Sequence, residues 1–142
     1  MNDVPLHKMI IKISRAHRRW AHEEFRKIDI TEGKPKILNY LAKNDGCIQR
    51  ELANNCNIEP ATVTSILNSM EKVELIYRTQ NPNDKRVSHV FLTNKGKEAQ
   101  KEVEKIFNSI DEECFYGFSE EEKKKTIGLL KRIYENIGRR ER

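Results

Sequence analysis

The segment from Pro60 to Thr93 restricts the possible folds of this 142-residue chain more than any other segment. Pro60 can occupy the first turn of a helix, where its missing N–H costs no hydrogen bond. Apolar residues then follow at the i, i+3, i+4, i+7 spacing of a buried helix face, namely Val63, Ile66, Leu67 and Met70. Residues 75–80 and 87–93 are rich in Val, Ile, Tyr, Phe and Thr, which predicts a β-hairpin with residues 81–86 as its polar, basic tip. An amphipathic helix must therefore lead straight into a hairpin.

The outward face of this helix carries small side chains and side chains with hydroxyl or amide groups. They are Ala61, Thr62, Thr64, Ser65, Asn68 and Ser69. A helix face that only meets water more often carries Glu and Lys. Small polar side chains let the backbone approach another surface closely and still offer hydrogen bonds to it. The pattern favours a helix that docks against a polar partner.

Three helical segments are expected before Pro60. The first is long and amphipathic, with apolar residues at mostly three- and four-residue steps: Leu6, Met9, Ile10, Ile13, Trp20 and Phe25. Thr31 is the expected N-cap of the second, which ends at the turn signal Asp45-Gly46. Its inward residues are Ile37, Leu38 and Leu41. The third runs from about Gln49 to near Asn57 and buries Leu52, Ala53 and Cys56.

The chain after the hairpin alternates apolar and charged positions at helical spacing. Thr93 is the expected cap of a helix that extends through Ile110. Ser119 and Glu122 have the spacing of a capping box and predict the start of a last helix. That helix carries a second apolar stripe, made of Leu129, Leu130, Ile133, Tyr134 and Ile137.

Composition excludes several classes of protein. Charged residues make up 35% of the chain and hydrophobic residues 37%, as expected for long helices with one solvated face. The longest apolar runs are far below the ~18 residues that a membrane span needs, so we expect no membrane association. No export signal is apparent near the N-terminus, and three cysteines are too few for a disulfide framework, which together favour the cytoplasm.

The order of three helices and a two-stranded ribbon is that of a winged helix-turn-helix, a mainly α fold with a small β-hairpin (α+β). We therefore expect one domain over 1–142, with a DNA-binding unit at 30–93 and dimerisation helices at 4–28 and 94–139. The flanking helices carry more apolar surface than that unit can cover, so a second copy of the chain is the expected partner. The expected dimerisation residues are Leu6, Ile10, Leu129, Leu130, Ile133 and Ile137.

The last helix before the ribbon of such a unit, which is the helix that Pro60 opens in this chain, enters the major groove as the recognition helix. The ribbon contacts the backbone or the minor groove. The expected DNA-binding residues are Ala61, Thr62, Thr64, Ser65, Asn68, Arg78, Asp84, Lys85 and Arg86. Asp84 lies two residues from Arg86 and can hold its guanidinium in one pose. A dimer places two recognition helices in successive major grooves, which predicts double-stranded DNA with a pseudo-palindromic site as the partner. The net charge of +5 permits a polyanionic partner without requiring one.

Other functions are disfavoured by what the sequence lacks. It contains no phosphate loop, no nucleophile elbow and no His-Glu-x-x-His, so no enzymatic activity and no cofactor are expected. The four histidines include no i, i+4 pair and the chain has no Cys-x-x-Cys, so no metal site is expected. Cys56 reads as a core residue, and neither Cys47 nor Cys114 has an evident electropositive neighbourhood for redox sensing. The remaining alternative is a helical module that binds another regulator and not DNA.

Several motifs also resemble the MarR family of bacterial transcriptional regulators. The match begins with Ile30-Thr31-Glu32-Gly33 and Ile37-Leu38-Asn39-Tyr40-Leu41, and continues with Arg50-Glu51-Leu52-Ala53 and Ala61-Thr62-Val63-Thr64. The family's wing reads Asp-Pro-x-Asp-x-Arg and closes with Leu-Thr-x-x-Gly. This chain has Asn81-Pro82-Asn83-Asp84-Lys85-Arg86 and Leu92-Thr93-Asn94-Lys95-Gly96 at those places. The resemblance covers roughly residues 6 to 100 closely.

The resemblance implies a homodimeric regulator that is more often a repressor than an activator. It also implies a cleft for a small anionic or phenolic ligand, lined here by Arg15, His17, Trp20, Ile37 and Tyr40. Three departures concern the DNA-binding unit. Glu74 replaces the usual glycine after the recognition helix, and Ile48 replaces the usual Ser or Thr cap of the third helix. Ser65 replaces a longer basic residue, so base readout is expected to depend more on the wing and on DNA shape.

Overall fold

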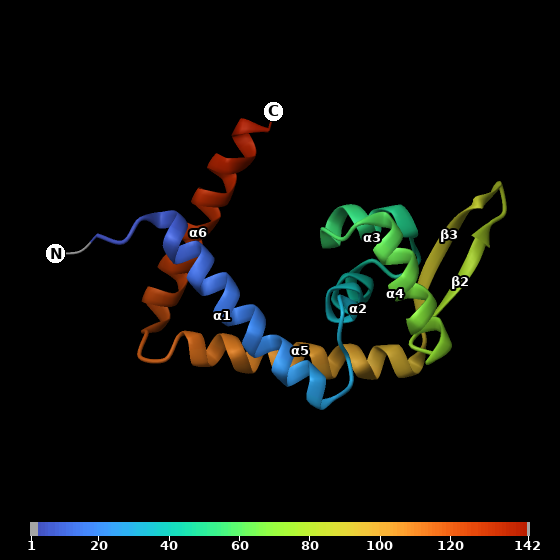
Figure 1. Cartoon of the computed structure of the whole chain (residues 1–142), viewed down its shortest axis with the longest axis horizontal. Helices are drawn as coiled ribbons and strands as arrows, with labels where there is room; N and C mark the ends of the chain where they lie inside the picture. Colours follow the sequence, from blue (N-terminus) through green and yellow to red (C-terminus); the bar gives the residue numbers. More distant parts are fainter. Residues whose placement is uncertain (1–2, 142) are drawn as a thin grey trace. The chain divides into compact units, whose positions relative to one another are not determined.

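The computed structural model describes residues 3–141, which form helices and one small antiparallel sheet. The elements are α1 (Leu6–Lys27), α2 (Lys34–Lys43), β1 (Cys47–Ile48), α3 (Gln49–Cys56), α4 (Pro60–Lys72), β2 (Ile76–Asn81), β3 (Asp84–Leu92), α5 (Asn94–Cys114) and α6 (Glu120–Arg140) (Figure 1). This order confirms the predicted mainly α fold with a hairpin after the helix that Pro60 opens. The chain divides into two compact units, one that ends at Asn108 and one that begins at Ser109. No helix within residues 3–141 has the length and apolar character to cross a membrane.

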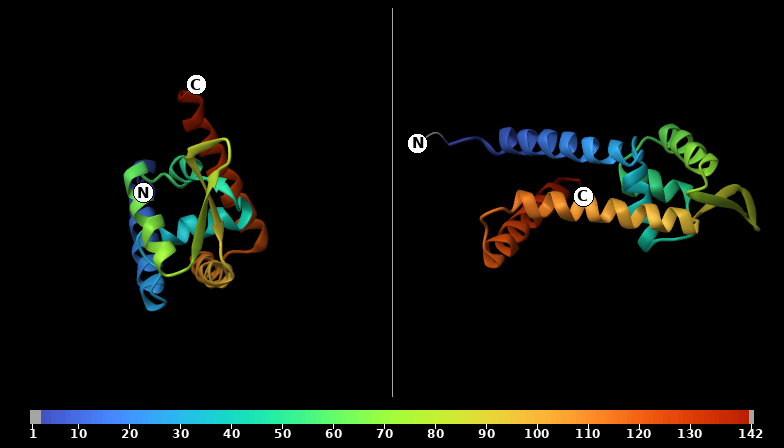
Figure 2. Two further views of the ribbon diagram at one scale, coloured as in Figure 1. Left: turned by 90° about the vertical axis from the view of Figure 1, so that its right-hand side faces the viewer. Right: turned by 90° about the horizontal axis from the view of Figure 1, so that it is seen from below.

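The core of the first unit lies among α2, α3, α4 and the sheet. Its fully buried large side chains are Ile37, Leu38 and Leu41 from α2, Leu52 from α3, Val63, Leu67 and Met70 from α4, and Ile76 and Val90 from the sheet. The helical residues among them belong to the stripes that the helical periodicity predicts. The β2–β3 hairpin extends away from this helical core (Figures 1 and 2). At the other side of the unit, Phe25 of α1 packs edge-on against Phe107 of α5, with ring centroids 5.0 Å apart.

The sheet has three strands in the order β1-β3-β2, and the first of them was not expected. In β1, Cys47 pairs with Val90 and Ile48 pairs with His89. A strand of two residues is too short to give an alternating pattern, so its signal in the sequence is negligible. Its role is to attach the start of α3 to β3 of the hairpin.

The predicted strand limits of the hairpin were wrong. Residues 81–86 do not form a loop, because Asn81 ends β2 and Asp84 begins β3, which leaves only Pro82 and Asn83 between the strands. The backbone N–H of Asn83 donates to Oδ1 of Asn81 at 2.8 Å, an Asx turn that closes this short connection. The register shifts between Gln80 and Asn81, and Asn81 pairs with Asp84. Polar residues that were predicted to form the tip therefore extend the two strands.

The predicted cap of the second helix was also wrong. The helix α2 begins at Lys34, and its N-cap is Gly33 with φ of 83°, not Thr31. Pro35 occupies the first turn, where its fixed φ suits a helix and its missing N–H costs nothing. The left-handed glycine turns the chain after the buried Ile30, and the helix start therefore lies two residues later than predicted.

The end of α4 is closed by a Schellman motif without a glycine. Glu74, which stands where the resemblance places a glycine, has φ of 62° and so adopts the left-handed conformation. The N–H of Leu75 donates to the carbonyl of Met70 at 2.9 Å, and the N–H of Glu74 donates to that of Glu71 at 3.1 Å. The helix α4 therefore ends at Lys72 with its last carbonyl groups bonded, and a left-handed glutamate is strained there.

The start of α5 is fastened to this helix end. The Thr93 hydroxyl donates to the carbonyl of Glu74 at 2.6 Å and accepts from the N–H of Gly96 at 2.9 Å, which confirms Thr93 as the cap. A side chain at Gly96 would collide with the Leu75 carbonyl, so this position requires glycine. The hairpin, the end of α4 and the start of α5 are thereby held together.

The second unit consists of the end of α5 and of α6. The helix α5 continues to Cys114, one turn beyond the predicted end at Ile110. The predicted capping box of α6 is confirmed: the N–H of Glu122 donates to Oγ of Ser119 at 3.1 Å, and the N–H of Ser119 donates to Oε1 of Glu122 at 2.8 Å. None of the described α6 residues is buried in the single chain.

Candidate DNA-reading surface

The outward face of α4 is exposed as the sequence predicted. Val63, Ile66, Leu67 and Met70 are buried on the inner face. The small and polar residues on the other face are exposed, and they are Ala61, Thr62, Thr64, Ser65 and Asn68. Only Ser69 departs from this description, because it is half-buried. The helix therefore offers hydroxyl and amide groups, close to its backbone, to a partner.

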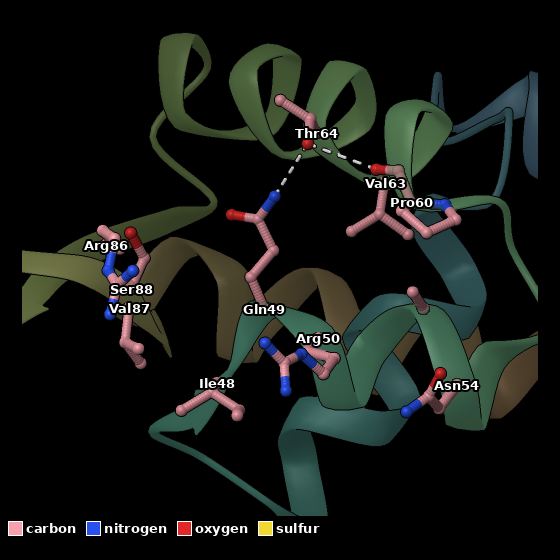
Figure 3. A pocket seen from close by; sticks show the side chains of 11 residues that line it. Ile48, Gln49, Arg50, Asn54, Pro60, Val63, Thr64, Arg86, Val87 and Ser88 are labelled. Atoms are coloured by element: carbon pink, nitrogen blue, oxygen red, sulfur yellow. Dashed lines mark hydrogen bonds between the residues drawn. The ribbon is translucent and has the colours of Figure 1, made fainter. Parts of the chain in front are cut away.

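Thr64 connects this face to the preceding helix. Its hydroxyl accepts from Nε2 of Gln49 at 2.8 Å and donates to the carbonyl of Pro60 at 3.2 Å (Figure 3). Gln49 is the first residue of α3 and was not among the predicted site residues. It belongs to no motif, and its contact with Thr64 lies 15 positions along the chain, so no sequence pattern indicates a role for it. The two hydrogen bonds fix the Thr64 side chain from within the chain.

A pocket of about 360 Å³ lies between the first turns of α3 and α4 and the strand β3 (Figure 3). Its lining includes two cations, Arg50 and Arg86, which the structure brings to the same pocket from different elements. The other lining residues are Ile48, Gln49, Ala53, Asn54, Pro60, Val63, Thr64, Val87 and Ser88. The α3 helix begins after Ile48, which has no side-chain acceptor for the first N–H groups of the helix. Positive charge and helix N–H groups together favour an anionic partner here.

Arg86 is held in one pose at the exposed end of the hairpin. Its Nε donates to Oδ1 of Asp84 at 3.1 Å and its Nη2 donates to Oδ2 at 3.2 Å, a two-point contact. The guanidinium lowers the pKa of the Asp84 carboxyl through these hydrogen bonds. The Arg86 side chain is nevertheless 91% exposed, so the ion pair orients the cation without covering it. Lys85 between them is also exposed.

Arg78 has a different environment from the other two cations of the hairpin. Its side chain is only 20% exposed, and it forms an ion pair with Glu71 of α4 at 3.1 Å. The Nη2 atom of Arg78, which forms this ion pair, also donates to Oδ1 of Asn68 at 2.7 Å. Hydrogen bonding to Arg78 lowers the pKa of Glu71. Arg78 is therefore engaged with the recognition helix itself, and its predicted contact with DNA stays a prediction.

Comparison with known proteins identifies the family of this chain. A sequence profile described as the MarR family matches residues 30–88. The chain is 30% identical to the transcriptional regulator HosA of Escherichia coli O111:H-, over 81% of this chain and 83% of that protein. It is 29% identical to the HTH-type transcriptional regulator YybA of Bacillus subtilis (strain 168), over 98% of this chain and 91% of that protein. The chain belongs to the MarR family.

Solved structures of MarR-type regulators share this fold. A MarR-family regulator from Listeria monocytogenes, solved in complex with a 26mer DNA, is 28% identical and superimposes with a TM-score of 0.83, covering 96% of this chain and 90% of that chain. The chain is accordingly a DNA-binding transcriptional regulator with the winged helix of this family, and not an enzyme. Within residues 3–141, no group of three or more His, Cys, Asp or Glu is placed to hold a metal ion.

The five residues predicted to line a ligand cleft lie on two helices of this MarR-family chain. Arg15, His17 and Trp20 are on α1, where Arg15 is exposed and the other two are half-buried. Ile37 of α2 is fully buried in the core. The Tyr40 hydroxyl donates to Oε2 of Glu51 at 3.4 Å, and burial together with that carboxylate raises the pKa of Tyr40. None of the five lines the pocket beside Arg86.

The predicted dimerisation residues form apolar stripes that the single chain does not cover. Leu6 and Ile10 on α1 are 55% and 45% exposed. On α6, Leu130 is 52% exposed, Leu129 and Ile137 are similarly exposed, and Ile133 is half-buried. Apolar side chains of this size at helical spacing are typical of a surface that another chain covers.

The cysteines occupy the positions that the sequence suggested. Cys56 is buried on the inner face of α3, and Cys47 is buried in β1. Burial raises the pKa of Cys47 to about 11 and also raises the pKa of Cys56. Cys114 is exposed, and its pKa is raised by partial burial and by the acidic Asp111 and Glu113. All three thiols are thus shifted away from the reactive thiolate form.

Proposed function

We propose that this MarR-family regulator is a homodimeric repressor that binds a pseudo-palindromic site in double-stranded DNA. The observation that carries the proposal is the exposed, small and polar face of α4 next to a hairpin whose exposed Arg86 is oriented by Asp84. A helix with such a face can enter the major groove, while the hairpin lies beside the flanking minor groove. The repressor role follows from the resemblance to the family. We expect the protein in the cytoplasm, together with its DNA.

The residues of this surface have different expected roles. Thr62, Ser65 and Asn68 are exposed on α4 and are the groups that we assign to base edges. Lys85 is the expected phosphate contact, because a lysine ammonium acts as a mobile point charge. Arg86 is the residue that we assign to the minor groove, where a narrow A·T-rich segment concentrates negative potential.

Dimer formation is supported by the uncovered apolar stripes of α1 and α6. In a two-fold dimer, each chain contributes one recognition helix, and the two helices must meet the duplex about 34 Å apart in successive major grooves. The site on the DNA then has the symmetry of the protein. We therefore expect two similar half-sites in opposite orientation.

A titration of fluorescein-labelled duplex with the protein tests DNA binding directly. Fluorescence anisotropy is measured at several salt concentrations for the wild type and for Lys85→Ala. Because each neutralised phosphate releases counterions, the variant should flatten the slope of log affinity against log salt by roughly 0.9 per contact, or nearly twice that for a dimer. Lys105→Ala removes one exposed cation from α5 at a residue that we do not assign to DNA, so it is the matched control and should leave the slope unchanged.

The same titration addresses the alternative function. A protein without measurable affinity for duplex DNA at low salt would contradict the proposal and favour a module that binds another regulator.

A second variant, Asn68→Ala, separates sequence-specific binding from general binding to DNA. It should lose roughly 1–3 kcal/mol on the preferred site and bind random DNA as tightly as the wild type. Equal losses on both duplexes would remove Asn68 from the base contacts.

We further propose that a small anionic or phenolic ligand modulates DNA binding through Arg15, His17 and Trp20 on α1. An arginine together with an aromatic ring can hold a carboxylate or a phenolate. Trp20 is the single tryptophan of the chain, so emission excited at a wavelength that tyrosine and the ligands do not absorb reports on this helix alone. Benzoate and phenol should change that fluorescence in the wild type, and benzoate should do so less in Arg15→Ala. An emission spectrum that stays constant up to millimolar ligand would contradict the site.

A further inference from the structure

Arg78 of β2 bridges two turns of the recognition helix. Its Nη2 donates to Oδ1 of Asn68 at 2.7 Å and to Oε1 of Glu71 at 3.1 Å, while its Nε donates to Oε2 of Glu71 at 3.3 Å. The two-point contact with Glu71 fixes the plane of the guanidinium. The side chain of Arg78 is mostly buried between the helix and the strand, so it has little room to move. The third contact, with Asn68, is therefore made by a cation that is already held in place.

This contact decides which way the Asn68 amide faces. A guanidinium can only donate hydrogen bonds, so the atom of Asn68 that faces Arg78 must be the oxygen. A flipped amide would direct its own N–H groups at a positive charge and would lose a charge-assisted hydrogen bond. The Nδ2 group is then the free end of an exposed side chain, and it makes no hydrogen bond within residues 3–141. Asn68 thus presents hydrogen-bond donors outward and keeps its acceptor turned to the strand.

We propose that Arg78 is a positioning residue that restricts Asn68 to keto bases, guanine or thymine, in the major groove. The inference rests on the proposed insertion of α4 into the groove. Arg78 acts in it through Asn68, without contacting a base.

The base edges explain the restriction. A free asparagine commonly pairs with adenine through two hydrogen bonds, in which Nδ2 donates to N7 and Oδ1 accepts from N6. Asn68 cannot aim both groups at one base while its oxygen faces Arg78. Guanine offers the acceptors N7 and O6, and thymine offers O4, so both suit a side chain that only donates. Cytosine presents only a donor, and adenine presents a donor next to its single acceptor, so both amino bases are disfavoured.

Asn68→Asp is the sharpest test, because it preserves shape and inverts the outward group. The aspartate still accepts from Arg78 through one oxygen, but its second oxygen now faces the groove as an acceptor. Selection of bound sequences from random duplexes is carried out for the wild type and for this variant. At one symmetric position of the site, the preference should change from guanine or thymine to cytosine or adenine, by roughly tenfold in the ratio of the two classes. Overall affinity is expected to fall because of the added negative charge, and the ratio is independent of that fall.

A second variant releases Asn68 without touching it. Arg78→Met together with Glu71→Gln removes the bridge, leaves no unpaired carboxylate and keeps the net charge, so general attraction to DNA is preserved. The freed amide can then form the two-bond pair with adenine, and adenine should rise at the same position. Thermal unfolding and affinity for random DNA are measured in parallel, since a merely structural role of Arg78 would change those two and leave the base preference constant.

The outcomes separate this inference from the function on which it depends. A wild-type site whose bases remain the same in both variants would overturn the role of Arg78 and Asn68, while DNA reading itself would stand. A wild type that enriches no sequence would overturn the proposed function and this inference with it. A change from keto to amino bases in Asn68→Asp, with a gain of adenine in the double variant, is the result that supports it.

Discussion

Asp84 is an acid on a surface that we assign to DNA, and its position explains why it is there. Its carboxylate receives both Nε and Nη2 of Arg86 and also the backbone N–H of that residue at 3.0 Å. The negative charge repels phosphate, but the fixed guanidinium loses less conformational freedom when it enters a groove. Whether orientation or repulsion has the larger effect on affinity can be measured.

We expect Asp84→Ala to weaken binding to the preferred site, although it removes a negative charge. Arg86 would then have to be ordered at the moment of binding, and the loss should be largest on sites with A·T-rich flanks. Asp84→Asn, which retains one acceptor oxygen, should recover part of the loss. Anisotropy titrations at constant salt measure all three proteins. Binding as tight as that of the wild type, or tighter, would show that the hairpin end is only a charged turn.

At the scale of elements, the junction of α4, the hairpin and α5 determines how the DNA-reading surface is held. Thr93 joins the two helices by one donated and one accepted hydrogen bond, and Nζ of Lys95 donates to the carbonyl of Val73 at 2.7 Å. These contacts cap the end of one helix with the start of the next. The surface therefore depends on hydrogen bonds made by residues that we do not assign to DNA.

Thr93→Val should lower the free energy of unfolding by about 1–2 kcal/mol, because it removes an N-cap and leaves the Glu74 carbonyl without this donor. Thr93→Ser keeps the hydroxyl and should lose much less. Urea denaturation followed by circular dichroism provides both values. Equal stabilities of the valine and serine variants would show that the hydroxyl contributes nothing.

Glu74→Gly should stabilise the protein. A left-handed glutamate costs about 1–2 kcal/mol, and glycine removes that cost at the expense of a more flexible unfolded chain, so we expect a net gain of about 0.5–1 kcal/mol. Glu74→Ala, which keeps a Cβ atom, is the control and should show no such gain. Thermal unfolding of the three proteins compares them, and a glycine variant with a lower melting temperature would contradict this explanation of the helix end.

Sequence patterns predicted the helices and the Asp84–Arg86 pair because these depend on neighbours along the chain. The stripe of α4 and the capping box at Ser119 are local in this sense. The two-residue strand β1, the contact of Gln49 with Thr64 and the bridge from Arg78 to Asn68 join residues 10 to 43 positions apart. No local spacing encodes such contacts, so the inner connections of the candidate site became visible only in three dimensions.

At the scale of the whole molecule, the account requires two chains. The stripe on α6 is amphipathic but buries none of its described residues in one chain, and isolated helices gain most of their stability from packing such a stripe. A second copy that covers these residues would also set the distance between the two recognition helices. In the proposed dimer, DNA reading and dimer formation are therefore linked.

Replacing Leu130 and Ile133 with glutamate should produce monomers and abolish tight binding to a symmetric site. Two charges in an apolar interface would have to be desolvated without partners, which costs far more than the contacts that they replace. Lys124→Gln with Lys131→Gln, two exposed positions on the same helix, lowers the net charge by the same amount, so it is the control for charge and should remain dimeric. Sedimentation velocity distinguishes the two forms, and a dimeric Leu130→Glu/Ile133→Glu variant would contradict the role of α6.

The symmetry of the DNA that the wild-type protein selects from random duplexes shows whether the protein reads DNA as a homodimer. Two chains with one recognition helix each should enrich two inverted half-sites whose centres lie about 10 base pairs apart, with A·T-rich flanks where the hairpins lie. Each selected duplex should bind one protein dimer. Enrichment of a single unrepeated half-site, or of no sequence at all, would contradict a homodimeric reader of DNA.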